Sequence, residues 1–313
     1  MSNLLPLFQT ALELGLISSL TVLALFLSYS MLNVCDLSTD GCFTLGAVVG
    51  ATVALAGHPW LSIPAAMFAG VLSGFVTAFL QTKMGVDSLL AGIIVNTALY
   101  SINIAIMSGS SLVNINKSET VFTKMQAWLA GIGLDKFNKL VVALIAVGLV
   151  ALFLYLFLKT KIGLAIRATG NNPDMVRSSS INPVMTTIVG LCVANAFTGL
   201  SGCLLAQSQK SVNIDIGSGM VTIALASLLI GRTFIRSRRM GFKIAGTVLG
   251  AFIFRLVYTV ALRFHMPAYM LKLVSSIIVI IAISGPYIKS KFPMIARRFE
   301  RAGAKKQTAG EGK

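Results

Sequence analysis

The chain alternates between long apolar runs and short polar interruptions. Nine runs are predicted to be membrane helices, because each is predominantly apolar and most approach the ~20 residues that cross a bilayer. They are Leu14–Leu32, Cys42–Ala56, Ile63–Gln81, Ser88–Met107, Leu140–Leu158, Val184–Ala206, Met220–Ile235, Gly241–Phe264 and Tyr269–Ile288. A β-barrel would alternate polar and apolar residues instead. We therefore predict an all-α, polytopic transmembrane helical bundle with about 8–10 membrane segments.

The second run differs from the others. Cys42–Ala56 is short for a full crossing, and a polar stretch separates it from the first run. It is interpreted as a broken or re-entrant element, which is tolerated only where its backbone is buried in protein or lines a cavity. Within the polar stretch, Ser38 or Asp40 would cap the helix that follows. The alternative is a substrate pathway, lined by Asp36, Ser38 and Thr39.

The composition excludes a soluble domain. Of the 313 residues, 56% are hydrophobic and 12% are charged, and the mean hydropathy is +0.84. Soluble domains carry roughly 25% charged residues. The formal net charge of +16 would by itself also suit a nucleic-acid partner. The positions of the basic residues decide between these interpretations.

The basic residues gather in three stretches between or after the apolar runs. Of 26 Lys and Arg, four lie in 159–182, five in 231–243 and eight in 289–313. Such an excess marks cytoplasmic loops, so no nucleic-acid partner is expected. The chain is predicted to be a multi-pass protein of the cytoplasmic membrane, in contact with lipid. Residues 1–288 form its membrane domain, and 289–313 form a basic cytoplasmic tail.

The loop 110–138 is predicted to be external and to carry an amphipathic helix. Its apolar positions follow helical spacing: Val121, Phe122, Met125, Trp128 and Leu129. One interpretation is a helix at the membrane surface, with Trp128 at headgroup depth. The other is part of a landing surface for an extracellular partner.

The cytoplasmic loop 159–183 contains its own short helix. Asn172 is a good helix cap, Pro173 fits the first helical position and Asp174 complements the positive end of the helix dipole. Pro183 favours a non-helical conformation at the residue before it, so the helix is predicted over Pro173–Ser180.

Two interpretations of this helix stay open on composition alone. Met175 and Val176 give it an apolar side, and Arg177 a charged one. A connecting loop usually needs only a few residues, so a long, structured and partly apolar one suits a docking surface for another protein. In the second interpretation, the helix lies against the membrane helices of its own chain.

Small residues recur at a spacing that lets membrane helices approach closely. The pairs are Gly46 and Gly50, Gly70 and Gly74, and Gly246 and Gly250. Helix packing is the interpretation we adopt for each pair.

The sequence contains neither a GxxxxGK[ST] phosphate loop nor an HExxH motif. We therefore predict no catalytic residues, no metal site and no cofactor, and the chain is not expected to hydrolyse ATP. One charge lies within an apolar run: Arg255, near Tyr258. An intramembrane Arg is a functional candidate. It would bind a substrate carboxylate, bond a helix carbonyl or extend to the surface.

A family resemblance rests mainly on Thr160–Ala206. This stretch resembles the permease subunits of ABC importers of the branched-chain amino acid and ribose type. The matching positions are Gly163, Arg167, Ala168, Ile181, Asn182 and Leu200-Ser201-Gly202, with Asp36-Leu37-Ser38, Ile216-Gly217-Ser218-Gly219 and Gly231 elsewhere. Two features depart from the family pattern. Ser180 replaces a usual Gly before the Ile-Asn pair, and the loop from Gly231 to Gly241 is more basic.

The resemblance implies a coupling helix that rests in a groove of an ATP-binding subunit. The residues implied for docking are Arg167, Asn172, Pro173, Asp174, Met175, Val176 and Arg177, with Met175 and Val176 filling the groove. It also implies two ATPase subunits, an external substrate-binding protein and a second permease subunit, in a homodimer. The subgroup it most resembles is linked to import of amino acids, aromatic ones among them.

Several alternatives stay open at this level. An ion-coupled secondary transporter would function without an ATPase, although no carboxylate lies deep within a clear run. An ABC permease for a sugar or nucleoside fits the same pattern. A membrane enzyme would need a clustered His, Asp or Glu site, and a scaffold would give no reason for the helix after Asn172.

Overall fold

A computed structural model describes residues 4–116, 118–129, 137–235, 237, 239–263, 273, 276–280 and 284. The last apolar run, apart from these isolated positions, and the basic tail 289–313 lie outside the described residues. The described helices are α1 (Leu4–Leu25), the π-helix η1 (Phe26–Met31), α2 (Thr39–Leu55), α3 (Ser62–Thr82), α4 (Ser88–Ile106), α5 (Val121–Leu129), α6 (Asn138–Phe157), α7 (Lys161–Asn171), α8 (Pro173–Ser178), α9 (Pro183–Gln209), α10 (Met220–Phe234) and α11 (Met240–Arg263).

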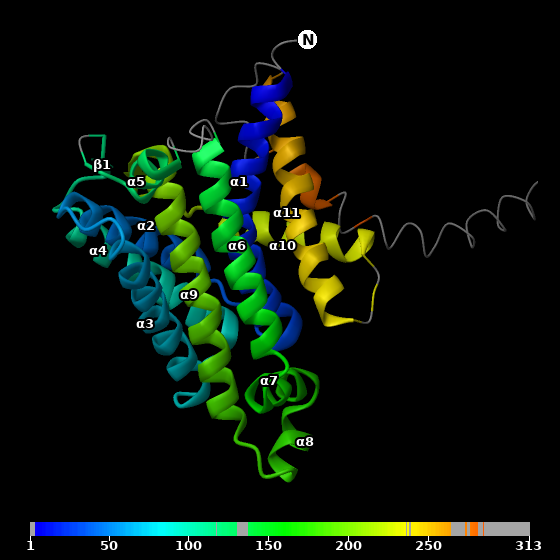
Figure 1. Ribbon diagram of the computed structural model, residues 1–313. Coiled ribbons are helices and arrows are strands. Elements are labelled where there is room, and N and C mark those ends of the chain that lie inside the picture. Colours follow the sequence, from blue (N-terminus) through cyan, green and yellow to red (C-terminus); the bar gives the residue numbers. More distant parts are fainter. Residues whose placement is uncertain are drawn as a thin grey trace, which may run out of the picture.

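The helices form an elongated bundle (Figure 1). Within the described residues, six helical stretches are long and apolar enough to cross a membrane, and α2 and α10 are shorter apolar helices. The predicted all-α polytopic bundle is therefore confirmed.

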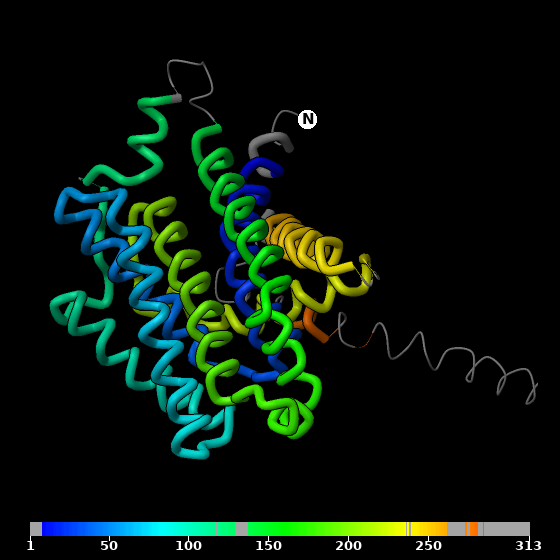
Figure 2. The backbone as a smooth tube through the Cα atoms, turned by 60° about the horizontal axis from the view of Figure 1, so that its bottom comes forward, coloured from blue at the N-terminus to red at the C-terminus, as the bar shows by residue number. Residues whose placement is uncertain are grey.

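Helix α9 lies at the centre of the bundle. In both views, α3 and α4 lie on one side of α9, whereas α1, α10 and α11 lie on the other (Figures 1 and 2). The small residues are responsible for the closest approaches. A Cβ at Gly46 would stand 2.2 Å from the carbonyl oxygen of Gly199, and one at Gly70 would stand 2.2 Å from that of Asn195. The predicted packing role of these glycines is confirmed, because no larger residue fits.

The two ends of the bundle carry different loops. At the end where the N-terminus lies, β1 (Leu112–Asn114) pairs antiparallel with β2 (Ser211–Asn213), and α5 lies nearby (Figure 1). The predicted amphipathic helix is present: Phe122 is buried, whereas Trp128 is 77% exposed. At the opposite end lie α7 and α8, which form most of the segment 159–183 that was predicted to be cytoplasmic.

The first span ends in an irregular way that the sequence did not predict. The α-helix continues as η1, whose last residue, Met31, lies against α7: a Cβ at Gly170 would stand 2.1 Å from the Met31 carbonyl oxygen. The chain then reverses at Asn33, which has φ of 58°. It re-enters the bundle before α2 begins at Thr39. The second run is therefore a helix that begins inside the protein.

Candidate functional site

The polar break before α2 has a buried centre, formed by Asp36, Ser38 and Thr39. The Asp36 carboxylate accepts hydrogen bonds from the Ser38 N–H at 2.8 Å, the Ser38 hydroxyl at 2.6 Å and the Asn195 amide at 2.9 Å. Asn195 lies midway along α9. The Thr77 hydroxyl of α3 donates to Ser38 at 3.1 Å. The break is thus bonded to two neighbouring helices, which satisfies backbone and side chain away from water.

This arrangement places the three predicted pathway residues away from any open space. Asp36, Ser38 and Thr39 are 1%, 0% and 2% exposed. Each has a hydrogen-bond partner within the break or on α9. In this conformation they therefore hold the break together rather than line a pathway. Asn195, which completes the network, carries no signal in the sequence because it lies 159 residues from Asp36.

Asp40 has a role that differs from the predicted one. We expected Ser38 or Asp40 to cap the helix that contains them, but Ser38 is the N-cap of α2 and makes no side-chain capping bond. The Asp40 carboxylate instead accepts from the backbone N–H groups of Gly219 at 2.9 Å and Val221 at 2.8 Å. Those groups are the unsatisfied donors at the start of α10. The first turn of α2 therefore caps the start of α10.

The intramembrane cation lies between α1 and α11. Arg255 is 9% exposed, and its Nε donates to the Ser18 hydroxyl at 2.8 Å. The guanidinium also lies 5.6 Å from the ring centre of Tyr258. Among the described residues, Arg255 has no ion-pair partner, because the two ion pairs found there involve Lys124 and Arg177. The structure does not bring Arg255 together with the break around Asp36.

At the end of the bundle that carries α7 and α8, α8 has the predicted start. The Asn172 side chain accepts from the N–H groups of Asp174 and Met175 at 3.0 Å each, and Pro173 occupies the first turn. Arg177 approaches Asp174 at 3.5 Å in an exposed pair. Such pairs contribute little to stability, so both side chains are available to another molecule.

The expected apolar side of α8 needs correction. Val176 is 2% exposed and packs into the chain itself, whereas Met175 is 64% exposed. The two side chains point in different directions because successive residues on a helix lie ~100° apart. Of the pair expected to fill a groove, only Met175 is accessible.

The backbone geometry at the end of α8 explains why glycine would suit position 180, where this chain has a serine. The N–H of Ile181 donates to the carbonyl of Val176 at 3.2 Å, and that of Ser180 donates to Arg177 at 3.1 Å. This is the Schellman arrangement, which places the intervening residue in the left-handed region. Ser180 has φ of 60°. Glycine adopts that conformation without steric cost.

Helix α7, which leads into α8, contacts the rest of the bundle at two places. The hydroxyls of Thr169 on α7 and Thr186 on α9 lie 2.8 Å apart, and Gly170 packs on the end of η1. Arg167 is half-buried on the same helix. A movement of α7 would therefore be transmitted to η1 and to the chain reversal that follows it.

Comparison with known proteins agrees with this architecture. A family model described as the branched-chain amino acid transport system permease component matches residues 8–283. The chain is 31% identical to a tyrosine transport system permease protein of Clostridioides difficile, with 85% of this chain and 86% of that one covered.

More distant relatives carry other substrates in their names. The chain is 27% identical to a probable branched-chain amino acid transport permease protein of Methanocaldococcus jannaschii, with 86% of each chain covered. It is 24% identical to a ribose import permease protein of Escherichia coli, with 79% of this chain and 75% of that one covered. No solved structure matches the chain.

Proposed function

The chain belongs to the family of branched-chain amino acid transport system permease components, and on this basis we propose that it imports an amino acid or a related compound across the cytoplasmic membrane. The family comprises ABC-type permeases, which are transmembrane subunits and not themselves enzymes. The sequence contains no phosphate-binding loop. We therefore assign ATP hydrolysis to a separate subunit.

The substrate class rests on the relatives. The tyrosine permease is 31% identical to this chain, compared with 24% for the ribose permease. This difference favours an amino acid, and a sugar or nucleoside is the alternative. Uptake of labelled tyrosine, leucine and ribose by cells that overproduce the chain with its neighbouring subunits would distinguish them. Uptake of ribose alone would contradict the amino-acid assignment.

The observation that carries the mechanism is the exposed face of α8. Met175, Asp174 and Arg177 are all exposed, at the end of the bundle that carries α7 and α8. We propose that this face enters a groove of the ATPase, with Arg167 on α7 at its edge. Asn172 and Pro173 then act by fixing the start of the helix.

The proposed assembly contains two copies of this chain, two ATPase subunits and an external substrate-binding protein. The domain assignment follows: 1–288 as the membrane domain, 159–183 as the ATPase-docking loop, 110–138 as external and 289–313 as a cytoplasmic tail. Closure of the ATPase pair would move α7 and α8, and α7 would move η1 through Gly170 and Met31. Such rigid-body shifts are how interfaces transmit a switch.

For the substrate carboxylate we propose Arg255, with Tyr258 beside it. A guanidinium has five N–H donors, and the bond of Arg255 to Ser18 uses Nε. Its two terminal nitrogen atoms are suited to a carboxylate. The buried trio of Asp36, Ser38 and Thr39 is assigned to holding the break before α2, so any contact with substrate would require the break to open.

The central test is purification without crosslinking, from cells that also produce the ATPase. We expect the ATPase to copurify with the chain and to be lost when Met175 is replaced by Asp. Transport by the purified chain alone, reconstituted in vesicles with an ion gradient, would contradict the proposal.

A further inference from the structure

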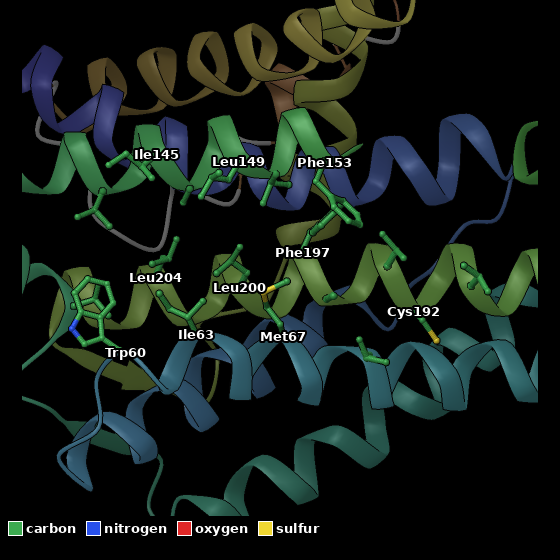
Figure 3. A pocket seen from close by; sticks show the side chains of 18 of the residues that line it. Trp60, Ile63, Met67, Ile145, Leu149, Phe153, Cys192, Phe197, Leu200 and Leu204 are labelled. Atoms are coloured by element: carbon green, nitrogen blue, oxygen red, sulfur yellow. The ribbon is translucent and has the colours of Figure 1, made fainter. Parts of the chain in front are cut away.

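A large apolar cavity lies between α6 on one side and α3 and α9 on the other. Its volume is about 680 Å³. Figure 3 shows Leu149 and Phe153 of α6 pointing toward Leu200 and Phe197 of α9. The rings of Phe153 and Phe197 lie 6.0 Å apart, edge to face. Trp60 marks one end of the cavity, and the lining contains almost no polar atoms.

The apolar lining decides what kind of molecule fits. Water is disfavoured because the cavity offers it no partners. A single acyl chain carries no polar atoms and matches this lining along its length. A helix of a second copy would also bury such a lining, so the choice between the two rests on the pocket at the Trp60 end.

The Trp60 end of the cavity adjoins a second pocket that contains a lysine. This second pocket, of about 400 Å³, is lined by residues that include His58, Trp60 and Lys124. Trp60 lines both spaces. Lys124 is paired with the exposed Glu119 at 3.2 Å. Such a surface pair is weak, and tryptophan favours the headgroup level of a membrane.

We propose that these two spaces form a binding site for one anionic phospholipid, with its acyl chain between α6 and α9 and its phosphate at Lys124 and His58. The cation matches the phosphate charge, and the dry cavity matches the chain. The site lies at the end of the bundle where α5 and the N-terminus lie (Figure 1). This inference goes beyond transport and does not depend on the substrate.

The position of the site has a mechanical consequence. Helix α6 leads directly into α7, and α9 begins after α8. The bound acyl chain would therefore separate α6 from α9, the two helices that precede and follow the α7–α8 segment. Its presence would set their spacing in the membrane.

Fluorescence of Trp60 tests the site. The chain has two tryptophans, so Trp128→Phe leaves Trp60 as the single emitter. The protein is purified in phosphatidylcholine nanodiscs and titrated with phosphatidylglycerol whose acyl chains are brominated, which quenches nearby tryptophan. We expect quenching to saturate at a low fraction of brominated lipid. Quenching that rises only in proportion to that fraction would show bulk contact and overturn the proposal.

Charge variants at the second pocket make the test independent of folding, because Lys124 and Glu119 are at least partly exposed. Lys124→Gln should raise the half-saturating lipid fraction about fivefold, as expected for one lost cation at a membrane surface. Glu119→Gln frees Lys124 and should lower it. Equal titrations for both variants would overturn the headgroup assignment.

A substitution that fills the cavity provides a second test of the lipid site. Ala146→Phe adds a ring to the α6 lining and should abolish saturable quenching, whereas Leu144→Phe, on the exposed face of α6, should not. If Ala146→Phe leaves the lipid titration unchanged but disrupts a dimer, the occupant is a second copy and the proposal is wrong.

Discussion

The carboxylate of Asp40, in the first turn of α2, accepts a hydrogen bond from the backbone N–H of Val221 at 2.8 Å. A second bond, from Gly219 at 2.9 Å, completes the cap of α10. Gly217 makes this approach possible, because a Cβ there would stand 2.1 Å from the Asp40 carbonyl oxygen. The starts of two short helices, one from each half of the chain, are thus joined inside the bundle.

Loss of this cap should affect both stability and transport. Asp40→Ala leaves two N–H donors without a partner, and the expected cost is about 1–2 kcal/mol of the free energy of unfolding. Asp87→Ala is the matched control, because Asp87 caps the exposed start of α4 through Leu89 at 2.9 Å. Thermal unfolding in detergent and uptake in cells are the measurements. Equal uptake by the two variants would contradict a role for the Asp40 bridge in transport.

Met175→Asp should abolish uptake while the protein stays in the membrane. A carboxylate in an apolar groove is costly to desolvate, so the ATPase should no longer bind. Met84→Asp is the control, because Met84 is equally exposed at 64% and lies in the turn between α3 and α4. Membrane fractionation, ATPase copurification and uptake check the prediction. Normal uptake by Met175→Asp would count decisively against docking through α8.

Arg255→Met should raise the KM for amino-acid uptake at least tenfold, which is about 1.4 kcal/mol of binding energy. Ser18→Ala separates this role from packing. It removes the 2.8 Å bond to Nε but leaves the guanidinium in place, so KM should change little. If the two variants lower thermal stability alike and neither alters KM, Arg255 joins α1 to α11 and does not bind substrate.

Asn195→Leu should destabilise the protein by about 1–3 kcal/mol, because it leaves one oxygen of a buried carboxylate unpaired. Asn195 bonds Asp36 across the bundle at 2.9 Å. Thr198→Val, on the same buried helix, removes only a bond of 3.3 Å to Ala194 within the helix and should cost less. Unfolding of the purified variants provides the comparison, and an equal cost would show that the break is not held by Asn195.

Ser180→Gly should stabilise the end of α8 by about 1 kcal/mol, because it removes the steric cost of a left-handed residue. Hydrogen exchange at the Ile181 amide, which donates to Val176, should slow accordingly. Ser179→Gly is the control: Ser179 has φ of −89°, so glycine there adds only flexibility. Faster exchange in Ser180→Gly would contradict this account of the turn.

Much of the architecture was available from local patterns. The apolar runs predicted the spans, since a bilayer requires ~20 apolar residues for each crossing. Asn172 and Pro173 predicted the start of α8 because a helix cap depends only on its nearest neighbours. The paired glycines predicted close contacts, although not the partner helix of each pair.

What the sequence by itself determined was therefore everything that depends on a residue and its neighbours along the chain: the spans, the short capped helix and the basic segments between spans. Only the tertiary structure decided which side of α8 faces outward, that Asp36 meets Asn195, and that Asp40 caps α10 instead of its own helix. These contacts join residues up to 181 positions apart. A side chain's hydrogen-bonding capacity is fixed by its type, but the partner it meets depends on how the whole bundle packs.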